Sequence, residues 1–145
     1  MQEYVTSTEK WLEAAVIGEI GNNTFDHNFQ FAHDCPRGVY FNSSYMGEYT
    51  VVADFGMGVM SSLKRVRPNI ASDVESVEMA FTQRISGRFP EQRGNGLKFV
   101  MQSVQQNNWS LFFQSGTGCC FADGSECFFS VSPLSVPGII AVLHF

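Results

Sequence analysis

The sequence predicts one α+β domain over residues 1–145, a two-layer sandwich in which helices cover one face of a mixed, mostly antiparallel sheet. Apolar residues at helical spacing are concentrated in the first two thirds of the chain, whereas residues 109–145 alternate or run apolar between glycine, serine and proline. Hydrophobic residues make up 44% of the chain, which is sufficient for a single core.

Helical spacing and capping residues predict four helices. The first is capped by Ser7 or Thr8, and the third begins with the capping box Ser72-Asp73-Val74-Glu75. Pro68 ends the short second helix. The predicted ranges are 7–27, 59–66, 72–84 and 97–106.

The remaining apolar runs predict strands. Runs 39–43 and 49–55 form a hairpin around a glycine turn. Four short strands then close the chain, because the glycines, serines and prolines between them are typical of turns. They cover residues 109–114, 119–122, 127–131 and 139–145.

The charge distribution limits the choice of partners. A net charge of −5 disfavours binding to nucleic-acid phosphates and to anionic membranes. The basic residues are nevertheless concentrated in the middle of the chain, either on a solvated helix face or near a bound phosphate. They are Lys64, Arg65, Arg67, Arg84, Arg88, Arg93 and Lys98.

Cysteine usage and the amino terminus predict a soluble cytoplasmic protein. Cys35, Cys119, Cys120 and Cys127 have no C-x-x-C spacing, so neither zinc nor a disulfide framework is indicated. We expect reduced thiols that pack as small core residues. No signal peptide or membrane-spanning stretch is expected.

The first candidate site lies in the first helix. Glu19, Asn23 and His27 are four residues apart and therefore share one helical stripe. An asparagine oxygen is a suitable ligand for Mg²⁺ beside nucleotide phosphates, and a carboxylate one turn away could activate a nucleophile. A solvated helix edge is the alternative explanation of this pattern.

The second candidate site, Asp54-Phe55-Gly56-Met57-Gly58, follows a buried strand. The Asp54 carboxylate could accept a hydrogen bond from the amino group of adenine, and the glycines would allow close approach of the backbone to the ring. An ordinary aspartate-glycine turn is the alternative.

The third candidate site, Gly94-Asn95-Gly96-Leu97, leads directly into the fourth helix. Exposed N–H groups at a helix start bind phosphate oxygens. The nearby Arg88, Arg93 and Lys98 favour phosphate neutralisation.

Other nucleotide and hydrolase motifs do not fit the spacing. The chain has no G-x-x-x-x-G-K-[ST], and Phe99 stands where a dinucleotide fingerprint requires its third glycine. No serine lies in a nucleophile elbow, and His27, His33 and His144 stand in no recognisable catalytic frame.

Taken together, E-x-x-x-N, D-x-G-x-G and G-x-G-L occur in an order that resembles the Bergerat (GHKL) ATP-binding domain of sensor kinases, gyrases, mismatch-repair ATPases and heat-shock chaperones. The resemblance covers about residues 11–145 and is closest to stand-alone modules such as anti-sigma-factor serine kinases. It implies a Bergerat fold that binds ATP or ADP with Mg²⁺.

The resemblance also implies roles for individual residues. Asn23 would be the Mg²⁺ ligand, Glu19 would polarise a nucleophile, and Asp54 would hold the adenine amino group. Gly56 and Gly58 would shape the adenine wall. Gly94, Gly96 and Leu97 would form the phosphate-facing end of an ATP lid that runs from about residue 59 to residue 93.

Three features depart from the family pattern. Lys98-Phe99 replaces a second Gly-Leu pair, the lid contains a predicted helix, and the Cys- and Phe-rich segment 116–137 is inserted before the final strand. The chain also lacks the helix pair that would carry a phosphoacceptor histidine.

Three functions follow from the resemblance. The first is a nucleotide-dependent regulatory module that signals to a protein partner and has weak ATPase activity. The second is an anti-sigma-type serine protein kinase, and the third is an interaction module without nucleotide turnover. Formation of a homodimer is left open by the sequence.

Overall fold

The computed structural model describes residues 2–29, 38–44, 48–83 and 95–145, and within the first helix it describes the side chains of residues 10–23. Its helices are α1 (Gln2–Phe29), α2 (Gly58–Leu63), α3 (Asp73–Thr82) and α4 (Gly96–Gln106). Its strands are β1 (Val39–Ser43), β2 (Tyr49–Asp54), β3 (Ser110–Ala122) and β4 (Cys127–His144). The predicted α+β class is confirmed.

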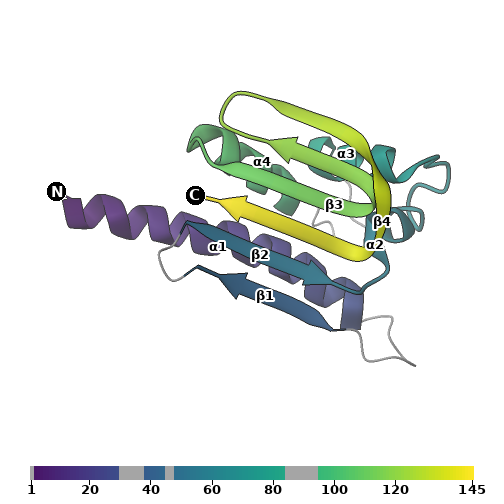
Figure 1. The fold of residues 1–145 in the computed structure, drawn as a ribbon, viewed down its shortest axis with the longest axis horizontal. Helices are drawn as coiled ribbons and strands as arrows, with labels where there is room; N and C mark the ends of the chain where they lie inside the picture. The colour runs from purple at the N-terminus through teal and green to yellow at the C-terminus, as the bar shows by residue number, and fades with distance from the viewer. Residues whose placement is uncertain (1, 30–37, 45–47, 84–94) are drawn as a thin grey trace.

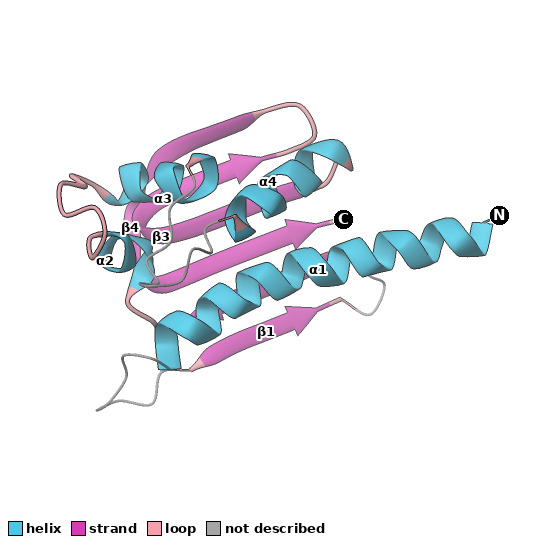
Figure 2. Ribbon diagram, turned by 180° about the vertical axis from the view of Figure 1, so that it is seen from behind, coloured by secondary structure: helices cyan, strands magenta, loops and turns pink. Residues whose placement is uncertain are grey.

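The strands form one sheet in the order β1-β2-β4-β3, and helices cover one of its faces (Figures 1 and 2). Each of the three strand pairs in the described residues is antiparallel, so the prediction of a mixed sheet is wrong. Because β4 returns between β2 and β3, the two hairpins of the chain are joined in the middle of the sheet.

Helix α1 begins at Gln2, earlier than the sequence predicted. Ser7 and Thr8 therefore lie within the helix and do not cap it. The first four residues after Met1 include no proline or glycine, so nothing in this segment stops a helix from extending. Val16 and Ile20, one turn apart, are fully buried and anchor α1 to the sheet.

The β1–β2 hairpin and the capping box of α3 are confirmed. Val52 pairs with Phe41 in the middle of the hairpin, while its turn lies outside the described residues. At the start of α3 the Ser72 hydroxyl accepts a hydrogen bond from the Glu75 N–H at 3.2 Å. The Glu75 carboxylate accepts from the Ala71 N–H at 2.8 Å, one residue before the position that a standard capping box uses.

The end of the chain forms two long strands, not the four short strands that were predicted. Glycine, serine and proline in segment 116–137 were interpreted as turns. In the structure Gly116 and Gly118 lie at register shifts, where the ladder is disrupted but both strands continue. Gly124 and Ser125 do lie in the connection between β3 and β4. Segment 116–137 is therefore an extension of the β3–β4 hairpin.

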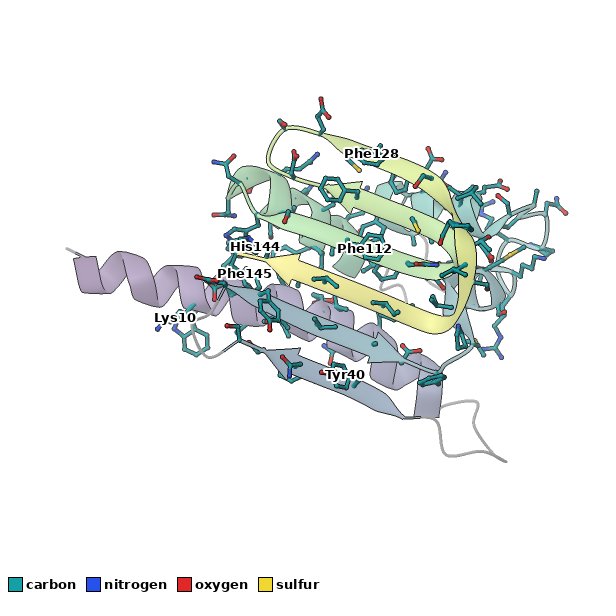
Figure 3. The ribbon with its side chains drawn as sticks, in the orientation of Figure 1. Lys10, Tyr40, Phe112, Phe128, His144 and Phe145 are labelled. Atoms are coloured by element: carbon teal, nitrogen blue, oxygen red, sulfur yellow. The ribbon has the colours of Figure 1, made fainter. Side chains whose placement is uncertain are left out.

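The core lies between the sheet and the helices. Phe113 of β3 meets Phe81 of α3 edge to face, with 5.1 Å between the ring centroids. The opposite face of the sheet presents Tyr40, Phe112 and Phe128, which are at least partly exposed (Figure 3). No helix in the described part of the chain is long and apolar enough to cross a membrane.

Candidate functional site

Asp54 is the last residue of β2, as the sequence predicted. Its side chain is only 7% exposed, and its Oδ1 accepts a hydrogen bond from the Gly56 N–H at 2.6 Å. Asp54 also lies on the same strand face as the core residue Val52, since the two are separated by two positions. The carboxylate is therefore fixed at the strand end, on the side of the sheet that the helices cover.

Two glycines with positive φ allow the chain to pack against this turn. Gly138 has φ of +70°, and a Cβ atom placed on it would overlap Asp54 and come within 2.6 Å of the Gly56 nitrogen. Gly58 has φ of +74°, and its Cβ would come within 2.9 Å of the Ser115 Oγ. Any side chain at either position would meet both a strained backbone and a steric overlap.

Ser115 of β3 completes this group of contacts, and sequence reasoning did not find it. Its hydroxyl donates to the Gly138 carbonyl at 2.8 Å and accepts from the Val59 N–H at 2.9 Å. A serine within a strand has no diagnostic spacing, and its two partners are 23 and 56 residues away in sequence. No sequence signal identified it.

Glu19 and Asn23 of α1 meet the first residue of α4. The Asn23 amide Nδ2 donates to the Glu19 backbone carbonyl at 2.9 Å. A Cβ on Gly96 would overlap the Glu19 carboxylate and lie 3.7 Å from the Asn23 Nδ2. The structure thus brings together three residues that the sequence placed in two separate motifs.

The predicted site residues therefore form two groups. One contains Asp54, Gly56 and Gly58, and the other contains Glu19, Asn23 and Gly96. Because α1 packs on the face of the sheet that Asp54 shares with the core, both groups lie on the same side of the sheet. An extended ligand with chemically different ends is the kind of molecule that two such groups could bind.

Other predicted residues contribute less or lie outside the described part. Leu97 packs against the core, which is a structural role. Gly94, Arg84, Arg88 and Arg93 lie outside the described residues, as does the side chain of His27. Most of the loop that the sequence predicts to face phosphate, with Arg88 and Arg93, therefore lies outside the described residues.

The predicted lid, residues 59–93, contains α2 and α3. Val77 and Phe81 of α3 are buried in the core, at 0% and 2% exposed. A helix that packs in this way is part of the scaffold, so α3 is not a mobile element of a lid.

The described cysteines are free thiols that favour the neutral form. Burial raises the pKa of Cys120, and neighbouring Cys127 raises it further. Burial also raises the pKa of Cys119, with Ser132 opposing the shift through its hydrogen bonds. Among the described residues, no group of three or more His, Cys, Asp or Glu could hold a metal ion.

No protein-family model matches the chain, and no curated protein matches it. The Bergerat resemblance thus rests on the order of the sequence motifs alone.

Proposed function

We propose that this chain is a Bergerat-type ATP-binding domain that acts as a nucleotide-dependent regulatory module for a protein partner. The observation that carries the proposal is the Asp54 carboxylate, which is buried at a strand end and fixed by the Gly56 N–H. A fixed, buried acceptor suits a ligand with a matching donor, such as the exocyclic amino group of adenine.

The glycines around Asp54 fit a planar base. Hydrogen in place of a side chain at Gly58 and Gly138 lets the Asp54–Gly56 turn, the start of α2 and β4 approach one another near the carboxylate. Such an approach lets the backbone contact the face or edge of a ring. The residues that would surround adenine thus all lie in the part of the chain that the structure describes.

Asn23 and Glu19 fit the metal and phosphate end. The Asn23 Nδ2 donates a hydrogen bond to the Glu19 carbonyl. Asn23 would bind Mg²⁺ through its amide oxygen, because Mg²⁺ takes oxygen ligands. When bound, Mg²⁺ would neutralise charge on the nucleotide phosphates. The Glu19 carboxylate, beside Gly96 at the start of α4, would hold the proton of an attacking hydroxyl or water.

The proposal includes a cytoplasmic location, where ATP is available and the free thiols stay reduced. Signalling to a partner would follow from a different affinity of that partner for the nucleotide-bound and nucleotide-free forms. ADP and ATP would then set the regulatory state.

Calorimetry with ATP and ADP, with Mg²⁺ and with chelator, tests the proposal. We expect the unmodified protein to bind both nucleotides and Asp54→Asn to lose at least about tenfold in affinity, the cost of one charged hydrogen bond. Asp123→Asn is the matched control, because Asp123 Oδ1 likewise accepts backbone N–H groups in its own turn, from Ser125 at 2.8 Å and Glu126 at 2.9 Å.

Absence of ATP and ADP binding up to millimolar concentration would overturn the proposal. Equal affinity of Asp54→Asn and the unmodified protein would overturn the adenine assignment alone. Glu19→Ala should bind nucleotide and lose hydrolysis, with the exposed Glu48→Ala as control. If the protein transfers the γ-phosphoryl group of ATP to a serine of a partner protein, its function is that of a serine protein kinase and not of a regulatory module.

A further inference from the structure

Ser115 connects three segments through one buried hydroxyl. It lies on β3, donates to the Gly138 carbonyl at 2.8 Å and accepts from the Val59 N–H at 2.9 Å. The residue is 2% exposed, so water cannot readily replace these hydrogen bonds. The hydroxyl therefore fixes the start of α2 and the segment before Ile139 against β3.

These two segments are the ones that enclose the Asp54 turn. Val59 directly follows Gly58, whose Cα already packs against the Ser115 Oγ. Gly138 packs against Asp54 and Gly56. A movement of either segment would therefore change the position of the Asp54 carboxylate.

The strand register places Ser115 and Asp54 on either side of one β4 residue. Ile139 pairs with Ser115 on β3 and with Asp54 on β2. In the sheet, only β4 separates Ser115 from Asp54. Outside the ladder, Gly138 contacts both residues, because its carbonyl accepts from Ser115 and its Cα packs against Asp54. This arrangement suits a residue that orients a neighbour without itself contacting a ligand.

We propose that Ser115 is a positioning residue that holds the Asp54–Gly58 turn in the geometry required to distinguish adenine from guanine. The inference rests on the proposed function. Adenine offers an amino donor where guanine offers a carbonyl acceptor, so a fixed carboxylate attracts the first and repels the second. A carboxylate that can move away discriminates less well.

Affinities for ATP and GTP with Mg²⁺ test this role in four variants. Ser115→Ala should lose at least about tenfold in the ATP-to-GTP affinity ratio, because the buried Gly138 carbonyl and the partly buried Val59 N–H lose their partner. Ser115→Thr keeps the hydroxyl and should retain the ratio. Ser115→Cys carries a thiol, a weaker hydrogen-bond donor of similar size, and should give an intermediate ATP-to-GTP affinity ratio. This variant takes the place of Ser115→Ala if the alanine variant does not fold.

Ser76→Ala is the matched control. Its hydroxyl is also buried and donates to a backbone carbonyl, that of Asp73 at 2.7 Å, but the hydrogen bond stays within α3. We expect this variant to lose stability and to keep the ATP-to-GTP ratio. An unchanged ratio in Ser115→Ala, or an equal change in Ser76→Ala, would overturn the inference.

Amide hydrogen exchange without nucleotide separates this inference from the proposed function. Ser115→Ala should speed exchange at Val59 and Gly56, and unchanged exchange at both would overturn the positioning role. If the unmodified protein binds no nucleotide while exchange at these amides responds to Ser115→Ala, the proposed function fails and the structural coupling stands.

Discussion

The carboxylate of Glu19 lies against the backbone of Gly96, so closely that a Cβ atom at residue 96 would overlap its Oε2. The contact joins α1 to the first residue of α4, and it also places Asn23 near the same point. It links the first and third of the sequence motifs. The coupling free energy between residues 19 and 96 can be measured in a double-mutant cycle.

Gly96→Ala should be more favourable in a Glu19→Ala background than in the unmodified chain. Alanine improves helix propensity by up to about 1 kcal/mol, but here the new methyl group must displace the Glu19 carboxylate. We expect a coupling free energy of at least about 0.5 kcal/mol in a double-mutant cycle followed by urea unfolding. Additive effects would show that the Glu19 side chain moves away without cost.

Gly138→Ala and Gly18→Ala should have opposite effects on the free energy of unfolding. At Gly138, with φ of +70°, backbone strain and overlap with Asp54 and Gly56 should together cost at least about 2 kcal/mol. At Gly18, inside α1, an added methyl group meets nothing within 4 Å and should stabilise by about 0.5–1 kcal/mol. A stable Gly138→Ala variant would contradict the close packing around Asp54.

Phe113→Ala should destabilise the protein far more than Phe112→Ala, although the residues are adjacent. Phe113 is 2% exposed and packs on Phe81, whereas Phe112 is 36% exposed on the opposite face of the sheet. The first change should cost about 3–5 kcal/mol, typical of a buried phenylalanine, and the second clearly less. Equal losses in urea unfolding would mean that the Phe112 face is covered in solution.

Stability should fall as the pH rises above the ordinary thiol pKa of 9.0, because burial raises the pKa of Cys120 in the folded state. Above pH 9.0 the unfolded chain loses the proton and the folded chain keeps it. The thiol's contribution is thus present at lower pH and lost at higher pH, by up to about 1.4 kcal/mol per pH unit.

Urea unfolding of Cys120→Ala from about pH 8 to about pH 10 checks this linkage. The variant should lose stability at every pH but show a flatter pH dependence than the unmodified protein. Ser103→Ala, which changes a buried residue that does not titrate, should keep the original slope. Parallel slopes for all three proteins would show that Cys120 does not contribute.

Local signals predicted the first hairpin and the start of α3 correctly. Two apolar runs on either side of a glycine turn predicted β1 and β2, and the Ser72 box places a cap within its own helical turn. Such features depend on residues near one another in sequence, which is why spacing alone reveals them.

Long-range contacts were not predicted. The Asp73 carboxylate, expected only near a helix start, also accepts hydrogen bonds from the Thr117 N–H at 2.9 Å and its hydroxyl at 3.1 Å. Ser115 is similar, since its partners come from two distant segments. In both cases the tertiary fold supplies the partner, and no local pattern records it.

The candidate site was predicted in part. Asp54 at a strand end and Gly96 at a helix start follow from the sequence, whereas the contact between Glu19 and Gly96 needed the packing of α1 on α4. Binding of ATP and Mg²⁺ stays a prediction. It depends on ligand contacts and on the loop that contains Gly94, which lies outside the described residues.

The register shifts in the β3–β4 hairpin change which positions of β3 face the core. Odd-numbered Leu111 and Phe113 enter the core on one side of the shifts, and even-numbered Cys120 and Ala122 do so on the other. A one-residue slip near the hairpin tip would reverse Cys120 and Phe121 without disturbing the strands beside Asp54. Sequence length at the tip can therefore vary while the candidate site keeps its geometry.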